Sequence, residues 1–128
     1  MKFAALTALV AIALPAPAFA SDWVFVDESV ASKDRYYIDR QSIRLMPNGY
    51  KRAWVRTDHN MPDKFGDTSA KVYYEHDCNQ GRRRMLTSTY YKGEEVTTSG
   101  NTVGSNAEWT YPSPDSIAET LLNLVCRR

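Results

Sequence analysis

The spacing of apolar residues changes once along this chain, and that change limits the folds it can adopt. Between residues 23 and 96, short aromatic and β-branched runs alternate with polar residues, as in half-buried strands. Near the C-terminus the apolar residues instead form one helical stripe, at Ile117, Leu121, Leu124 and Val125. Strands followed by one helix predict an α+β domain: a single twisted antiparallel sheet with a C-terminal helix on one face.

Turn and cap residues divide the strand region into segments. The expected strands cover residues 23–26, 36–38, 43–45, 50–57, 71–78 and 83–91. Asn48 and Gly49 supply the positive φ angles of a tight hairpin turn, and Asp39 is placed to cap a single helical turn that ends at residue 42. The stretch 97–107 is rich in Gly, Ser and Asn, and it predicts a mobile loop.

The first 20 residues have the pattern of a secretory signal peptide. Lys2 precedes an apolar run over residues 3–14, and small residues end the segment, so we expect cleavage after Ala20, with Ala18 as the second choice. An uncleaved membrane anchor is the alternative, but two prolines interrupt its apolar stretch. Ser21 stands where a lipidated cysteine would follow the signal, so no lipid anchor is expected.

Cleavage leaves residues 21–128, which is the length of one domain. Loss of Lys2 reduces the 16 basic residues to 15, which equals the 15 acidic residues, so the mature chain has no formal net charge. A neutral domain has no overall field that steers it onto nucleic acid or an anionic membrane. We expect no nucleic-acid partner, no transmembrane helix in the mature chain, and a periplasmic location, with the cell surface or secretion as alternatives.

The C-terminal helix has two candidate starts and one expected attachment. It begins either with Ser113 as its N-cap or with a capping box formed by Ser116 and Glu119. The chain has two cysteines, Cys78 and Cys126, and an even number in an exported protein favours a disulfide. A buried pair of free thiols is the alternative. Loop closure gives such a bond about 4 kcal/mol as an upper value.

No catalytic or metal-binding constellation is recognisable. The two histidines, His59 and His76, lie in a predicted loop and a predicted strand, and the sequence has no Cys-x-x-Cys or His-x-x-x-His spacing. The sequence also lacks a Gly-x-Ser-x-Gly elbow, a Walker loop and a Gly-x-Gly-x-x-Gly turn. We therefore expect a non-enzymatic protein without a cofactor or a metal ion.

Arg82, Arg83 and Arg84 form the one notable run of charge. Alternate residues of a strand point to opposite faces, so at most two of the three share a surface. A bond between the cysteines would bring Arg127 and Arg128 near them, and the five arginines would form a candidate site for an anionic ligand or partner. The alternative is a solvated strand edge that discourages aggregation.

Tyrosines are concentrated in the predicted strands. Six of the eight occur as three doublets, at residues 36–37, 73–74 and 90–91. Within each doublet one side chain faces the core and the other faces outward. We take Tyr37, Tyr74 and Tyr90 as a candidate contact surface on the sheet, because outward tyrosines suit protein contacts. Ordinary sheet packing is the alternative.

The order and spacing of several aromatic, turn and cysteine residues resemble the surface-adhesin protein E family. These residues are Trp23, Tyr37-Ile38-Asp39, Ser42-Ile43, Trp54, Asp77-Cys78, Tyr90, Gly93, Trp109, Pro112, Ser116-Ile117 and Cys126. The resemblance spans nearly the whole chain after the signal segment. It implies a six-stranded antiparallel sheet, a C-terminal helix and a disulfide between Cys78 and Cys126.

The resemblance also implies a function. It implies binding to host matrix and serum proteins, and dimerisation through the sheet. The name-giving type of the family is anchored by an N-terminal lipid, whereas this chain has Ser21 at that position. The leading interpretation is a non-enzymatic, exported cell-envelope protein with a protein partner. The alternative is a periplasmic accessory protein that binds an anionic ligand or polymer through the arginine cluster and the polar stretch 97–107.

Overall fold

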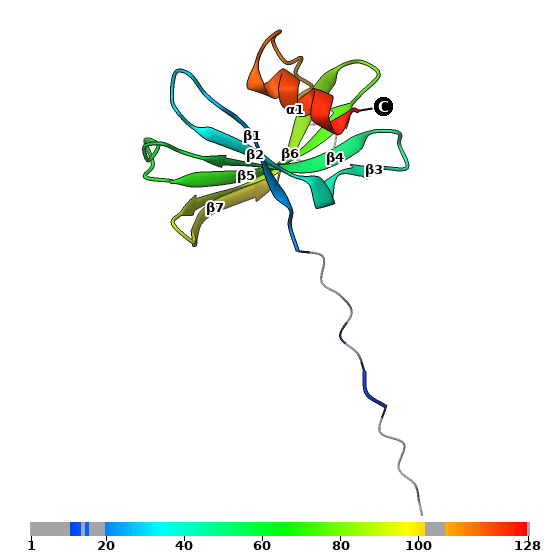
Figure 1. Cartoon of the computed structure of the whole chain (residues 1–128), viewed down its shortest axis with the longest axis horizontal. Helices are drawn as coiled ribbons and strands as arrows, with labels where there is room; N and C mark the ends of the chain where they lie inside the picture. The colour runs from blue at the N-terminus through cyan, green and yellow to red at the C-terminus, as the bar shows by residue number, and fades with distance from the viewer. Residues whose placement is uncertain (1–10, 14, 16–19, 102–106, 128) are drawn as a thin grey trace, which may run out of the picture.

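The structure, a computed structural model, describes residues 11–13, 15, 20–101 and 107–127. The strands of this part are β1 (Trp23–Glu28), β2 (Arg35–Asp39), β3 (Arg44–Leu45), β4 (Lys51–Asp58), β5 (Ser69–Asp77), β6 (Arg82–Lys92) and β7 (Glu95–Asn101). The helices are the 3-10 turn η1 (Arg40–Ser42) and α1 (Ile117–Val125). The strands form one antiparallel sheet in the order β1-β2-β4-β5-β6-β7, with β3 beside β4. Figure 1 shows α1 on one side of this sheet, which confirms the predicted α+β fold.

The hairpin predicted at Asn48 and Gly49 joins β3 to β4. Gly49 has a φ of +86°, which side chains of L-residues rarely allow. The N–H groups of Met46 and Gly49 donate to the carbonyls of Tyr50 and Met46 at 2.8 and 2.9 Å, and these bonds close the turn. The turn therefore fixes the start of β4, the strand that lies between β2 and β5.

Asp39 caps the single helical turn, as predicted. Its Oδ1 accepts the N–H of Gln41 at 3.1 Å and the N–H of Asp22 at 2.8 Å. Because Asp22 immediately precedes β1 and Asp39 ends β2, one buried carboxylate fixes the pairing of these two strands at this end. The residue that caps the helical turn thus also stabilises the β1–β2 pair of the sheet.

The predicted mobile loop over residues 97–107 is wrong for residues 97–101, because they belong to β7. Ser99 pairs with Thr89 and Gly100 with Ser88 along the outer edge of β6. The ladder bonds join backbone groups only, so an edge strand needs no apolar side chain to form. Residues 102–106 of the predicted loop lie outside the described residues.

The helix begins at the second of its two candidate starts. The Ser116 hydroxyl accepts the N–H of Glu119 at 3.1 Å, and Glu119 in turn accepts the N–H of Asp115 at 3.3 Å. Leu121 and Val125 of the predicted stripe are buried, and so is Leu122, which the stripe omitted. A helix lying on a curved sheet buries a wider arc than a single stripe.

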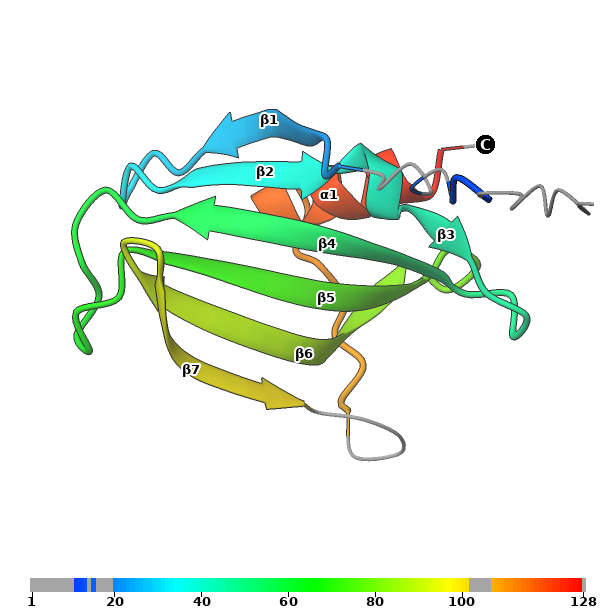
Figure 2. The ribbon, with the colours of Figure 1, turned by 90° about the horizontal axis from the view of Figure 1, so that it is seen from below.

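The core lies between α1 and the sheet. Its buried members from the sheet are Ile38 of β2 with Ala53 and Val55 of β4, and they pack against Leu121 and Val125 of α1. In Figure 2 the sheet is seen from its other side, with α1 behind the strands. One face of the sheet therefore supports the core, and the other carries no helix among the residues that the structure describes.

A disulfide joins Cys78, directly after β5, to Cys126 at the C-cap of α1. The Cα atoms are 5.5 Å apart, and 48 residues separate the two cysteines in the sequence. This confirms the predicted bond. It ties the end of the helix to the middle of the sheet, next to the core residue Val125.

Candidate functional site

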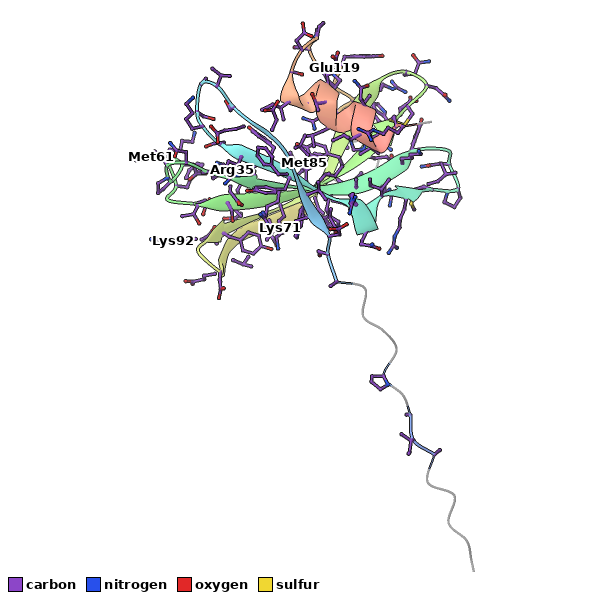
Figure 3. All side chains as sticks on the ribbon, viewed as in Figure 1. Arg35, Met61, Lys71, Met85, Lys92 and Glu119 are labelled. Atoms are coloured by element: carbon purple, nitrogen blue, oxygen red, sulfur yellow. A yellow bond between two sulfur atoms is a disulfide. The ribbon has the colours of Figure 1, made fainter. Side chains whose placement is uncertain are left out.

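The face of the sheet without α1, here called the open face, carries a large set of aromatic and charged side chains. Ala53 and Val55 point toward α1, so the alternate residues of β4 point away from it. The strand register extends this set across the sheet, to Trp23, Phe25, Tyr37, Arg52, Trp54, Arg56, Lys71, Tyr73, Glu75, Arg82, Arg84 and Tyr91. Figure 3 labels Lys71 on the side of the sheet away from α1.

Cations lie over aromatic rings at the β1–β2 end of the open face. The Arg56 guanidinium is 4.2 Å from the ring centre of Tyr37 and 5.3 Å from that of Trp23. The Lys71 ammonium is 5.8 Å from Trp23 and 5.0 Å from Tyr91. Such contacts contribute about 0.5–1 kcal/mol each at exposed sites. The rings and cations thus hold one another in place on a half-exposed surface.

The same arrangement continues to the edge of the sheet. Arg35 lies 5.0 Å from the ring centre of Phe25, and the Phe25 and Tyr37 rings meet edge to face at 5.7 Å. Phe25 is 47% exposed although it is large and apolar. We call this set the aromatic–cation patch and define it as Trp23, Phe25, Arg35, Tyr37, Arg56, Lys71 and Tyr91.

The centre of the open face is a stacked pair. Trp54 of β4 and Tyr73 of β5 are direct partners in the register, and their rings stack at 4.9 Å with 19° between the planes. A cross-strand aromatic pair of this kind stabilises the sheet. It also separates the aromatic–cation patch from a more polar end of the open face.

At that polar end, Glu75 is fully buried between two arginines. Its two oxygens accept from Arg52 Nε at 2.8 Å and from Arg84 Nη2 at 2.6 Å. Burial alone would raise the pKa of Glu75, but the hydrogen bonds and charges of Arg84 and Arg52 outweigh it, and the pKa stays below its ordinary value. The carboxylate is therefore ionised and is shared by both arginines, so the triad keeps one net positive charge.

Trp109 covers this end of the open face. Its ring lies 4.5 Å from the Arg82 guanidinium and 4.4 Å from that of Arg84, and it meets Tyr50 edge to face at 5.1 Å. A backbone bridge between Thr110 and β6 holds this segment against the sheet. Trp109 thus packs on the polar end of the open face, whereas the aromatic–cation patch at the other end includes the exposed Phe25 and Arg35.

The structure separates the five arginines of the predicted anion site. Arg82 pairs with Asp77 at 3.0 Å and Arg84 with Glu75, both on the open face. Arg83 points to the opposite face and lies 4.2 Å from the Tyr74 ring. Arg127 lines a hollow beside β1, together with Arg40, and Arg128 lies outside the described residues. The described arginines therefore form no shared, unneutralised cluster.

The predicted tyrosine surface is divided in the same way. The doublets do split between faces, but Tyr37 alone of the three candidates lies on the open face. Tyr74 packs against the core under α1, and Tyr90 lines a hollow of about 470 Å³ with Phe65 and Asp67. In these two doublets it is Tyr73 and Tyr91 that reach the open face.

Sequence reasoning missed the cations of the patch. Arg56 follows Trp54 by two residues and Lys71 precedes Tyr73 by two, so the period of a strand already places each pair on one face. Isolated charges such as these give a weaker signal in the sequence than the three consecutive arginines at residues 82–84. Whether the two cations also lie side by side depends on the register of β4 and β5, which pairs Arg56 with Lys71.

The histidines serve the fold and form no metal site within the described residues. His59 lies 3.3 Å from the Asp34 carboxylate and connects the loop after β4 to the turn after β1. His76 of β5 is fully buried beneath α1, and neither ring nitrogen makes a well-formed hydrogen bond to another described residue.

Stability is expected to fall in mild acid because His76 resists protonation. Burial, followed by the charge of Arg83, lowers its pKa to about 4, while the Lys51 backbone and Glu75 oppose the shift less strongly. In the unfolded chain the pKa of His76 is about 6.5, so His76 binds a proton there while the folded protein still does not. The free energy of unfolding should therefore fall by about 2 kcal/mol between pH 7 and pH 5. Urea unfolding at these two pH values measures the loss. It should shrink to a few tenths of a kcal/mol in His76→Leu, and an equal loss in both proteins would contradict the assignment.

Together, the fold and its surface define a class: a small disulfide-linked α+β domain whose distinctive site is an aromatic, cationic sheet face. In the described part no helix is long and apolar enough to cross a membrane. The chain belongs to the surface-adhesin protein E family, which matches residues 23–127. This confirms the resemblance seen in the sequence.

Solved structures of Haemophilus influenzae protein E share this fold. Crystal form II has a TM-score of 0.56 and 15% identity, covering 88% of this chain and 93% of that one. The selenomethionine form has a TM-score of 0.55 and 14% identity, covering 88% and 92%. The structure from non-typeable H. influenzae has a TM-score of 0.50 and 13% identity, covering 91% and 82%. No curated protein sequence matches the chain.

Proposed function

We propose that this chain is an exported, non-enzymatic binding protein of the cell envelope, which binds a protein partner through the aromatic–cation patch. The family description, surface-adhesin protein E, supports an adhesin-like role with matrix or serum proteins as partners. Residues 1–20 act as a cleaved signal peptide, and residues 21–128 form the functional domain. A second copy of the chain is a further partner that the family resemblance suggests.

The observation that carries the proposal is the composition of the patch. Tyr, Trp, Phe and Arg are the residues that dominate the energetics of protein interfaces, because they bury large areas with little loss of side-chain freedom. Here they lie on a face that neither α1 nor η1 of the described chain covers, and the exposed Phe25 lies at its edge. Rings already fixed by Arg56 and Lys71 have little conformational entropy to lose on binding.

The charge of the patch indicates the chemistry of the partner. Arg56 is neutralised by Asp58 at 3.0 Å, whereas Arg35 and Lys71 make no ion pair with any described residue. An acidic region with exposed apolar side chains would complement two free cations among aromatic rings. Binding through this patch should weaken moderately in salt, because only part of its contact area is charged.

A matched pair of double variants tests the proposal. Phe25→Ala with Lys71→Ala removes an aromatic ring and a cation from the patch. Phe65→Ala with Lys64→Ala makes the same two changes in the loop after β4, where the ammonium lies 5.0 Å from the ring. Immobilised matrix and serum proteins are the probes. We expect the patch variant to bind at least about ten-fold more weakly, and the control variant to bind as the unaltered protein does.

Export is tested with protein taken from expressing cells, by its cell fraction, its intact mass and its accessibility to protease. The protein is prepared from the envelope fraction of expressing cells, where intact mass should identify Ser21 as its first residue, and external protease is applied to intact cells. Saturable binding that survives moderate salt, together with removal by protease, supports an adhesin. Protection from protease until the outer membrane is permeabilised would turn the search to periplasmic partners. Equal binding by both double variants would exclude the patch.

A further inference from the structure

A cavity of about 150 Å³ lies between α1 and the sheet, apart from the open face. Apolar side chains form most of its wall, including Val55 and Val72 from the sheet and Ile117, Ala118 and Leu121 from the helix. Tyr36, Thr57 and Ala118 at its border are only half-buried, so the cavity is reached from the edge of the helix. An engineered cavity of about this size in another protein holds benzene, a molecule of six carbons.

One strong cation lines this apolar cavity. Arg83 enters it from β6, and its guanidinium stacks on the Tyr74 ring at 4.2 Å. Its neighbours Arg82 and Arg84 both pair with carboxylates, whereas Arg83 makes no ion pair with any described residue. Its Nη1 is shielded from water and has no acceptor in the described part of the chain.

An unpaired, buried guanidinium nitrogen is unfavourable in the isolated protein. Leaving such a donor without an acceptor costs about 1–3 kcal/mol, and more when the group is charged. An anion that enters the cavity recovers this free energy. The stacking on Tyr74 fixes the plane of the guanidinium and leaves its nitrogens free to bind a carboxylate in two-pronged fashion.

The other polar groups of the cavity are hydroxyls. Burial, with the charge of Asp34 and the proximity of Tyr74, raises the pKa of Tyr36 above its ordinary value, although Arg83 opposes the shift. The phenol therefore keeps its proton and is able to donate a hydrogen bond. Thr57 and Tyr74 supply two further hydroxyls. The cavity thus combines one cation and three hydroxyl-bearing side chains with apolar walls, and its lining contains no carboxylate among the described residues.

We propose that this cavity binds a small monocarboxylate of about five carbons in all, its carboxylate on Arg83 and its hydrocarbon body against α1. An inorganic anion fits less well, because most of the wall would face a hydrated ion without offering it a hydrogen bond. A neutral apolar molecule would leave the guanidinium unpaired. The site is independent of the aromatic–cation patch, since it lies on the opposite face of the sheet.

Pentanoate is the probe, with 1-pentanol and inorganic phosphate as comparison ligands at matched ionic strength. We expect pentanoate to raise the Tm of the purified protein saturably, by about 5 °C or more, and to titrate as one site in calorimetry. Pentanol and phosphate should do neither. Absence of a saturable effect of pentanoate, or an equal effect of either comparison ligand, overturns the proposal.

Two variants locate the site. Arg83→Met keeps apolar bulk but removes the charge, and it should weaken pentanoate binding at least about ten-fold. Arg127→Met, which removes an exposed arginine at the far end of α1, is the matched control and should bind normally. Ala118→Leu fills the cavity from the helix without altering a charge, so it should abolish binding while the protein stays folded. Normal binding by Arg83→Met or by Ala118→Leu contradicts the proposed site.

Discussion

Glu75→Ala should destabilise the protein by about 3 kcal/mol, because Glu75 is the buried counter-charge of two arginines. Glu75 is fully buried, and its removal leaves Arg52 and Arg84 facing each other without a counter-charge. The expected loss is at the low end for a broken buried pair, because the two arginine side chains are 30% and 20% exposed and regain some water. Urea unfolding at neutral pH measures it.

Asp58→Ala is the matched control for this prediction. It also removes a carboxylate that pairs with an arginine of β4 on the open face, but Asp58 is 41% exposed. Exposed pairs contribute at most about 1 kcal/mol, so the control should change stability little. A Glu75→Ala protein as stable as the Asp58→Ala protein would show that the buried triad contributes nothing.

Glu75 should also make the free energy of unfolding fall further at low pH. Its pKa is lowered in the folded state, so its stabilising contribution is present above the pKa of the unfolded chain and is lost as the pH falls through the folded pKa. This range lies below the one in which His76 acts, whose loss begins near its unfolded pKa of about 6.5. Glu75→Gln should reduce the loss of stability in this lower range, to which Asp34 and Asp63 also contribute because their pKa values are lowered, and it should keep the loss due to His76.

The local features of the fold were predictable because each depends on neighbouring residues. The Asn48-Gly49 turn needs only two residues that accept positive φ, and the Asp39 cap needs only one carboxylate before a helical turn. The disulfide followed from the number of cysteines. The turn and the cap depend only on residues that are close together in the sequence, and the tertiary structure is consistent with these local preferences.

The features that failed depend on strand phase and register. Tyr74 seemed as eligible as Tyr73 for the outer surface, but its partner in β4 is the buried Ala53, so it faces the core. Tyr90 likewise pairs with the buried Ala70 of β5. Bulges add Leu86 in β6 opposite Tyr73 and Tyr74, and Thr97 in β7 opposite Tyr90 and Tyr91, so the alternation shifts in the partner strands in a way that propensity does not reveal.

The arginine run was misjudged because charge pairing is a cross-strand property. The turn after Cys78 places Asp77 opposite Arg82 and Glu75 opposite Arg84, so each open-face arginine meets a carboxylate. Arg83 has the opposite orientation and no such partner among the described residues. The run therefore contains two carboxylate-paired arginines and one that enters an apolar cavity, which are three side chains with two unrelated roles.

Removal of the disulfide should have the largest effect of any substitution considered. The double variant Cys78→Ala with Cys126→Ala is expected to lose up to about 4 kcal/mol, since the bond closes a loop of 48 residues in the unfolded chain. For a domain of this size the Tm should fall by more than about 10 °C. Beside the bond, the end of α1 is held by the core packing of Val125 and by Lys51 Nζ on the Val125 carbonyl at 3.3 Å.

Reduction provides the control without a mutation. Dithiothreitol should lower the Tm of the unaltered protein to that of the double variant and should leave the variant unchanged. Hydrogen exchange should then show α1 losing protection before the strands, because the sheet keeps its own backbone ladder when the helix separates. A shift within about 2 °C on reduction would mean that the packing of Leu121 and Val125 on β4 alone secures the helix. A large fall in Tm on reduction would mean that α1 needs the disulfide to stay on its face of the sheet. The protein would then need an oxidising compartment to keep the fold in which the aromatic–cation patch lies on the other face.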